Sequence, residues 1–230
     1  MAVAATVAAM SIGLVADGGA STPIAAADKK ALERTLARVF ATLPRPAKGY
    51  RLDRANGSRE IARATSAWAL ANEAPAEAAE TRVYERTGAG ESEESVVLEV
   101  RVYINQERSL PDPLGSEGGT PQTTTQDGMP CLRVSLAGVD AGRVALPLTR
   151  EDEGNALTVL RAYVGASAIE PYLVDVARGR TPAATPWDAR KARRPSEVRT
   201  IVVEYYGPRA DVERLLRATR SGPLRALLTP

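Results

Sequence analysis

The sequence predicts an α+β protein, in which an antiparallel sheet of about four to six strands carries helices from both ends of the chain. Three observations support this class. Apolar residues near both termini recur every three or four positions, which is typical of amphipathic helices. Between these regions, apolar and polar residues alternate. Segments rich in Gly, Pro and polar residues separate the alternating runs, as in antiparallel hairpins.

The bulk composition fits one domain of ordinary size. The chain has 230 residues, of which 44% are hydrophobic and 25% charged, and these values are typical of soluble globular proteins. Aromatic residues make up only 4%, so we expect a core built mainly from Val, Leu and Ala. The formal net charge of +2 does not by itself indicate a nucleic-acid partner.

The first residues have the pattern of an export signal. Residues 2–16 are uncharged, small or apolar, and Ala25-Ala26-Ala27 stands directly before Asp28, although no Lys or Arg precedes the run. This pattern predicts a signal peptide over 1–27 and a mature domain over 28–230. Two alternatives stay open, an extension of a cytoplasmic protein and a membrane anchor. An anchor is disfavoured because about 15 helical residues span only about 22 Å of a ~30 Å bilayer core.

The first predicted element of the mature domain is a helix over 29–43. Asp28 is a favourable N-cap, and Pro44 and Pro46 end the helix. The residues expected to face the core are Leu32, Leu36, Val39, Phe40 and Leu43. Residues 57–80 carry few large apolar side chains, and we expect a loosely packed helix or an irregular segment there.

The middle of the chain predicts two hairpins. Residues 96–105 alternate over ten positions and predict a half-buried strand, which pairs with 80–86 through the turn at 88–94. Residues 110–130 are rich in Gly, Pro, Thr and Gln and predict a long polar loop. A second hairpin is expected between 131–138 and 143–149.

The remaining elements alternate between strand and helix. Residues 157–164 fit either a strand or a helix, and a strand is favoured; Ser167 and Glu170 form a possible capping box for a short helix. A basic, Pro-broken linker is expected over 181–195. A strand over 198–206 and a helix over 209–219 follow, with Val212, Leu215 and Leu216 facing inward and Gly222-Pro223 ending the helix.

The absence of certain residue types excludes several chemistries. The chain has no histidine, which rules out Ser-His-Asp and Cys-His catalysis and every histidine-containing zinc site. Cys131 is the only cysteine, so neither an internal disulfide nor a thiolate metal cluster can form. Carboxylates are the abundant groups left for acid–base chemistry. The densest acidic cluster, 151–155, favours a turn or helix start, and its combination with Asp140 does not match an EF-hand.

The clearest candidate for a binding surface is basic. Residues 178–230 contain 12 Lys and Arg against five Asp and Glu, whereas residues 60–99 contain nine Glu and three Arg. A possible contact with an anionic partner involves Arg178, Arg180, Arg190, Lys191, Arg193 and Arg194. The alternative is a solvated segment whose charges pair with the acidic region of the same molecule. Nucleic acid is disfavoured because only Trp187 could stack on a base within this cluster.

Part of the chain resembles a known group of sequences. The matching parts are Leu43-Pro44-Arg45-Pro46, Gly49-Tyr50 and the closing segment TIVVEYYGPRADVERLL at 200–216. These motifs resemble those of uncharacterised exported bacterial α+β proteins, in which a first helix leads into an LPxPxG-aromatic turn. The resemblance implies an exported α+β domain and brings no catalytic residue, metal or cofactor with it.

These observations favour a periplasmic or secreted, non-enzymatic binding or accessory module of the cell envelope. Its expected partner is a protein or an anionic envelope component, with no transmembrane span after removal of the signal and no cofactor. A carboxylate-dependent hydrolase and a cytoplasmic interaction protein stay open as alternatives. The hydrolase would require two carboxylates in a cleft, one of them with a raised pKa.

Overall fold

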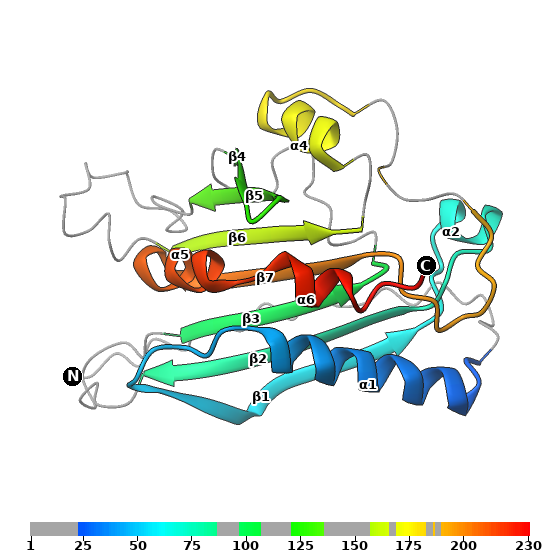
Figure 1. Ribbon diagram of the computed structural model, residues 1–230, viewed down its shortest axis with the longest axis horizontal. Coiled ribbons are helices and arrows are strands. Elements are labelled where there is room, and N and C mark those ends of the chain that lie inside the picture. Colours follow the sequence, from blue (N-terminus) through cyan, green and yellow to red (C-terminus); the bar gives the residue numbers. More distant parts are fainter. Residues whose placement is uncertain are drawn as a thin grey trace, which may run out of the picture.

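The computed structural model describes residues 23–86, 97–106, 121–135, 157–165, 169–182, 186 and 190–230. Helices lie mainly near the two ends of this part of the chain, and five strands follow one another in its middle (Figure 1). Their bounds are α1 Ala26–Thr42, β1 Tyr50–Ala62, α2 Ala67–Ala71, β2 Glu77–Arg86, β3 Val97–Ile104, β4 Pro121–Gln126, β5 Met129–Ser135, β6 Leu157–Val164, α4 Ile169–Ala177, β7 Ile201–Pro208, α5 Arg209–Ala218 and α6 Ser221–Arg225.

One sheet of seven strands forms the centre of the fold. Its order is β1-β2-β3-β7-β6-β5-β4, and every neighbouring pair is antiparallel. The two meanders β1-β2-β3 and β4-β5-β6 lie on either side of β7. The predicted α+β class and antiparallel sheet are confirmed, but the predicted count of four to six strands is too low. The sheet is wider because both polar edge strands, β1 and β4, lie in segments predicted as non-strand or loop.

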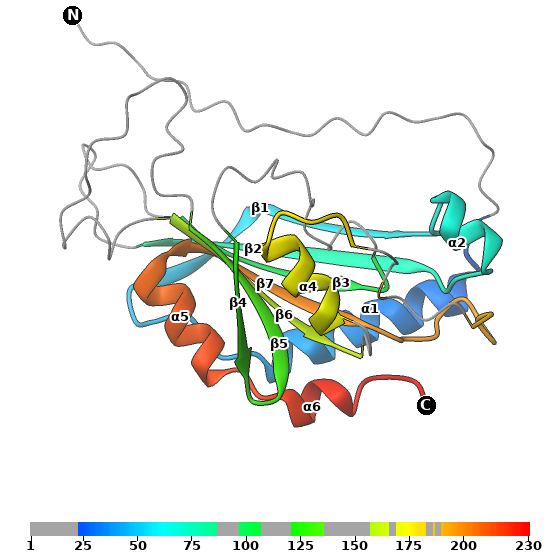
Figure 2. The same cartoon turned by 90° about the horizontal axis from the view of Figure 1, so that it is seen from above.

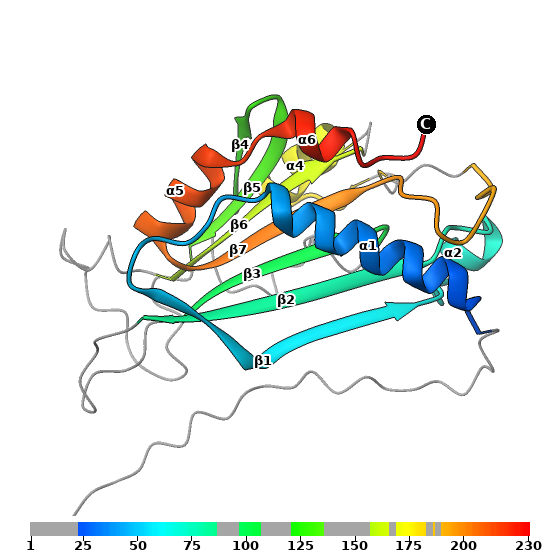
Figure 3. The same cartoon turned by 60° about the horizontal axis from the view of Figure 1, so that its bottom comes forward.

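Helices cover the two faces of the sheet unequally. α1, α5 and α6 lie on one face, along the sheet from β1 to β6 (Figure 3). α4 lies on the opposite face and contacts β4 and β5 (Figure 2). No helix among the described residues is long and apolar enough to cross a membrane.

The main core lies between the sheet and the three helices of the first face. Leu32, Leu36 and Val39 of α1 are fully buried there, as the helical spacing predicts. Alternate residues of β3, from Leu98 to Ile104, contribute the sheet side of this core, as expected for the half-buried strand predicted over 96–105. The inward residues predicted for α5, Val212, Leu215 and Leu216, are also buried. Burial of such apolar surface is the main source of stability in this layer.

A second, smaller core lies under α4. Ile169 and Leu173 of α4 pack against side chains of β5, β6 and β7 on the opposite face of the sheet. Its buried members are Leu132, Val134, Tyr163, Ile169, Leu173 and Val202. β6 is therefore buried on both faces. Apolar residues are needed on both sides of such a strand, which explains the weak alternation of residues 157–164.

Several predicted boundaries are wrong for physical reasons. α1 begins at Ala26 with Ala25 as its N-cap, so Asp28 lies in the first turn, where its charge favours the positive end of the helix dipole. Residues 57–80, predicted as a loosely packed helix or an irregular segment, contain the end of β1, the short α2 and the start of β2. α5 ends at Ala218, and Gly222 and Pro223 lie within α6, because proline is tolerated in the first turn of a helix.

The described part of the predicted polar loop 110–130 also differs from its prediction, whereas residues 110–120 lie outside the described residues. Residues 121–126 form β4, which joins β5 through a two-residue turn at Asp127 and Gly128. The first predicted hairpin is confirmed as β2 and β3, although its turn lies outside the described residues. β5 has β4 and β6 as neighbours, and the partner predicted for it at 143–149 lies outside the described residues, as does Ser167 of the predicted capping box.

Candidate functional site

A large hollow lies where the end of α1 meets β1, β2 and β3. Its volume is about 680 Å³. It is lined by Ala37, Phe40, Ala41, Leu43, Pro44, Arg45, Pro46, Ala47, Lys48, Tyr50, Arg82, Tyr84 and Val100. We call it the Pro-turn groove, because residues 43–50 form one of its walls. The turn noted in the sequence thus lines a cavity, which its sequence alone did not indicate.

The charge of the Pro-turn groove is of one sign. Arg45, Lys48 and Arg82 line it, and none of its lining residues is an acid. Arg45 and Lys48 are exposed, and within the described part of the chain neither takes part in an ion pair. Two aromatic side chains, Tyr50 and Tyr84, are half-buried beside these cations. The groove therefore offers positive charge together with partly exposed ring surface.

The wall of the groove is held in place by backbone restrictions and one long-range hydrogen bond. Pro44 and Pro46 prevent the helix from continuing, and Gly49 has a φ of +105°, which favours glycine. The Tyr50 hydroxyl donates to Asp211 Oδ2 of α5 at 2.9 Å. Burial, with a contribution from the carboxylate of Asp211, raises the pKa of Tyr50 to about 12, so the hydroxyl stays a donor at neutral pH.

The floor of the groove contains a fixed arginine. The Nε of Arg82 donates to Glu80 Oε1 at 2.9 Å, and its guanidinium carbon lies 3.8 Å from the centroid of the Phe40 ring. Glu80 is 7% exposed and also pairs with Arg59 at 2.7 Å. The carboxylate and the ring both hold the guanidinium of Arg82, which reduces the entropy lost when a ligand binds.

A polar network lies on the opposite face of the sheet, across β3, β7 and β6. Glu204 is 1% exposed and accepts hydrogen bonds from Arg101 Nη1 at 3.0 Å and Arg161 Nε at 2.5 Å. Arg101 also donates to Glu99 Oε2. Because both carboxylates already accept bonds from arginine, the network serves to join three strands. It does not supply the free acid that the hydrolase hypothesis needs.

The single cysteine is a buried thiol. Cys131 is fully buried on β5, and its Sγ donates to the carbonyl of Met129 at 3.3 Å. Burial raises the pKa of Cys131 to about 12, so the nucleophilic thiolate is not populated at neutral pH. The cysteine therefore acts as a small core residue.

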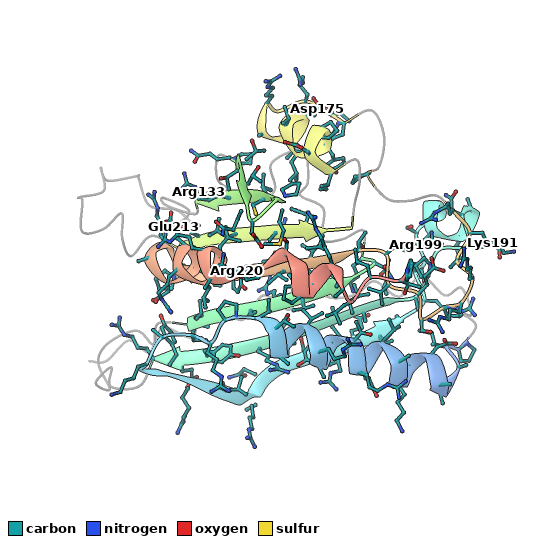
Figure 4. The ribbon with its side chains drawn as sticks, in the orientation of Figure 1. Arg133, Asp175, Lys191, Arg199, Glu213 and Arg220 are labelled. Carbon is teal, nitrogen blue, oxygen red and sulfur yellow. The ribbon has the colours of Figure 1, made fainter. Side chains whose placement is uncertain are left out.

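The structure places the predicted basic cluster in two separate regions. Arg178 and Arg180 lie after the end of α4, and Arg180 pairs with Asp175. The segment from Arg190 to Arg194 lies beside α2, where Figure 4 labels Lys191. There Lys191 Nζ is 2.6 Å from Glu73, which belongs to the acidic region 60–99. Two cations of the cluster, Arg180 and Lys191, are thus paired within the molecule, while Arg178 and Arg194 are exposed.

The predicted acidic cluster 151–155, Asp140 and Trp187 lie outside the described residues. Within the part of the chain that the structure describes, no group of three His, Cys, Asp or Glu residues could hold a metal ion. Sequence reasoning missed the contribution of Arg82 and Phe40 to the groove. It identified the helix and the strand that carry them, but no local pattern shows that these two elements face each other.

Comparisons with known proteins add no identification. The chain matches no protein-family model, no curated protein and no solved structure. The resemblance to exported bacterial proteins therefore stays a prediction, and function has to be argued from the geometry of the chain.

Proposed function

We propose that this chain is a non-enzymatic binding module of the cell envelope, exported to the periplasm or the medium, whose Pro-turn groove binds an acidic ligand. The observation that carries the proposal is the lining of the groove, which contains three cations and no carboxylate. Since Arg45 and Lys48 form no ion pair with another described residue, an anion can accept charge-assisted hydrogen bonds from both. Arg82 adds a fixed donor at the floor.

The shape and lining of the groove favour an acidic polysaccharide as the ligand. Tyr50 and Tyr84 present partly exposed rings, on which the apolar face of a sugar ring can pack. The carboxylates of uronic acid units would then reach Arg45 and Lys48 at the rim. A volume of about 680 Å³ is in the range of sites that hold ligands of a few rings.

The chemistry of the described residues supports binding over hydrolysis. Glu80, Glu99 and Glu204 each accept hydrogen bonds from arginine, and Cys131 is a buried thiol. A carboxylate hydrolase needs one acid that is held protonated near its substrate. None of these groups lines the Pro-turn groove, so we expect the ligand to leave unchanged.

The test is a binding titration with polygalacturonate as an acidic probe and dextran as a neutral one. We expect the wild-type chain to bind polygalacturonate and not dextran, with an affinity that falls as salt rises from 50 to 200 mM. The double variant Arg45→Gln/Lys48→Gln removes the two exposed cations of the groove. It should weaken binding by roughly tenfold or more.

The matched control removes the same charge elsewhere. Arg178→Gln/Arg194→Gln changes two exposed cations of the predicted basic cluster and leaves the groove intact. If this variant loses binding and the groove variant keeps it, the anionic contact is the basic cluster. If both variants lose binding equally, the effect is one of net charge and the groove is not the site. Release of shortened polygalacturonate during the titration would support the hydrolase.

A further inference from the structure

β4 is an edge strand whose central residues are exposed. Within the described sheet it pairs with β5 alone, and residues 122–125 are all exposed. An exposed edge presents unpaired N–H and C=O groups, and natural proteins usually cover or block such an edge. Three successive threonines form the middle of this one, and threonine has a high strand propensity. The edge is therefore suited to extension by another strand.

The hairpin turn determines which backbone groups point outward. Asp127 and Gly128 have φ values of +50° and +69°, as in a two-residue type I′ turn. In such a hairpin the flanking pair, Gln126 and Met129, exchanges both of its hydrogen bonds, and the pattern alternates from there. Thr124 then faces β5, while the N–H and C=O groups of Thr123 and Thr125 point away from the sheet.

Pro121 fits the same alternation. It lies two residues before Thr123, so its backbone nitrogen also points outward, where the absence of an N–H costs no ladder bond. The free edge thus has donors at Thr123 and Thr125 and ends at Pro121. An added strand would pair with about six residues.

The edge is held rigidly against the helices of the first face. Gln126 Nε2 donates to the carbonyl of Arg217, and the backbone N–H of Ser221 donates to Asp127 Oδ2 at 2.7 Å. Arg225 Nη2 donates to the carbonyl of Gly128 at 2.9 Å. A fixed edge loses little conformational entropy when a further strand is added.

Two hollows flank β4, one on each face of the sheet. The first, between β4 and α5, has a volume of about 320 Å³, and Arg133, Glu213 and Arg217 contribute to its lining. The second, between β4 and α4, has a volume of about 150 Å³, and Glu170, Leu173 and Val174 contribute to its lining. Alternate side chains of an added strand would enter these two hollows in turn.

The two hollows differ in chemistry. In the first, the carboxylate of Glu213 pairs with Arg133 at 3.2 Å and with Arg217 at 3.5 Å (Figure 4 shows Arg133 and Glu213). Arg209 also pairs with Glu213 at 2.9 Å, so three cations share one carboxylate. An acidic side chain there meets an excess of positive charge. The second is smaller, and Leu173 and Val174 line it together with Thr123 and Thr125. It suits a small apolar side chain.

We propose that β4 binds an extended peptide segment of a partner protein as an eighth, antiparallel strand. The segment alternates acidic residues, which lie in the hollow of Arg133 and Arg217, with small apolar residues, which lie over Leu173 and Val174. This mode of recognition obtains affinity from main-chain hydrogen bonds and specificity from alternate side chains. The proposal concerns a different surface from the Pro-turn groove and does not depend on it.

The probe is the synthetic peptide acetyl-Thr-Val-Glu-Val-Glu-Val-Thr-amide, with a fluorophore for measurements of anisotropy. In antiparallel addition, directly opposed residues share a face. The peptide residues that hydrogen-bond Thr123 and Thr125 are therefore the valines. N-methylation of two valines should weaken binding at least about tenfold, whereas N-methylation of the two glutamates should leave it within about twofold. Weaker binding of the peptide methylated at its glutamates, with the valine-methylated peptide unaffected, identifies parallel addition to the same edge.

Variants of the chain test the same edge from the other side. Thr123→Pro removes an outward N–H that takes no part in the β4–β5 ladder, and it should weaken binding at least about tenfold. The matched control, Thr123→Val, keeps the N–H and should bind like the wild type. Far-ultraviolet circular dichroism checks that each variant is folded. If Thr123→Pro does not fold, the N-methylated peptides still decide the question.

Two results would overturn the proposal. Equal binding of all three peptides shows that no backbone pairing occurs. A chain that dimerises in sedimentation experiments without peptide, and becomes monomeric as Thr123→Pro, shows that the edge is occupied by a second copy of the chain. Slower amide exchange at Thr123 and Thr125 on addition of the peptide, with no change at Thr124, supports the proposal.

Discussion

Arg101 on β3 and Glu204 on β7 are 103 residues apart in the sequence, and they form an ion pair of 3.0 Å between directly opposed positions of the sheet. Arg161 of β6 binds the other oxygen of Glu204. The carboxylate therefore joins the two meanders of the sheet through the strand between them. Its burial makes the pair sensitive to the loss of either charge.

Glu204→Gln is expected to destabilise the fold strongly. It removes the carboxylate that pairs with Arg161, whose side chain is 12% exposed, and we expect a loss of about 2 to 4 kcal/mol in the free energy of unfolding. Glu99→Gln is the matched control, because Glu99 pairs with Arg101 but is 20% exposed; it should cost less than about 1 kcal/mol. Urea denaturation measures both. Equal losses would show that burial of Glu204 is not what makes the pair important.

Asn105 is expected to be essential at the end of β3. Its Nδ2 donates to the carbonyls of Ala76 and Glu197, and its Oδ1 accepts from the N–H groups of Arg199 and Thr200. Its φ is +56°, which most residues avoid. Asn105→Ala should cost roughly 3 to 5 kcal/mol in the free energy of unfolding, through four lost bonds and backbone strain. Asn105→Gly should cost about 1 kcal/mol less, because glycine relieves the strain. A larger loss for the glycine variant than for the alanine variant in thermal or urea denaturation would contradict this account.

The fold is expected to lose stability in alkali. Burial raises the pKa of Cys131 from 9.0 to about 12 and those of Tyr50 and Tyr103 from 10.0 to about 12. Between pH 9 and 12 the folded chain therefore holds protons that the unfolded chain releases. The contribution of these three groups to the free energy of unfolding is complete below about pH 9 and declines as the pH rises from about 9 to 12. The measurement is the free energy of unfolding from pH 7 to 11.5. Tyr50→Phe and Tyr103→Phe should each reduce the decline above pH 10, and Cys131→Ala should reduce it above pH 9. A flat profile for the wild type would contradict these assignments.

The predicted signal cleavage has a structural consequence. Removal of residues 1–27 would delete the start of α1 at Ala26 and the partly buried Ile24, which packs on the main core. We expect a chain that begins at Asp28 to fold, with a loss of about 1 kcal/mol relative to one that begins at Pro23.

The location of the chain is tested by its N-terminal sequence in fractions of its native host. A terminus at or near Asp28 in the periplasm or medium supports export and the envelope function. A terminus at Met1 in the cytosol would support the cytoplasmic interaction protein.

The sequence alone determined the elements with a buried apolar face. The helical spacing around Leu36 and Leu215 and the alternation of β3 predicted these elements and their inward residues, because burial on one side leaves a periodic pattern in the chain. The antiparallel α+β class followed from the order of these patterns. The exclusion of histidine chemistry required only the composition.

The tertiary structure alone decided the edges and the sites. β1 and β4 are polar and exposed along most of their length, so they lack the alternation that identifies a strand, and only pairing with β2 and β5 makes them part of the sheet. Arg45 and Arg82 likewise line the same Pro-turn groove, and Arg133 and Glu213 line the hollow between β4 and α5. Such sites depend on contacts between residues far apart in the chain, and local periodicity carries no information about which elements meet.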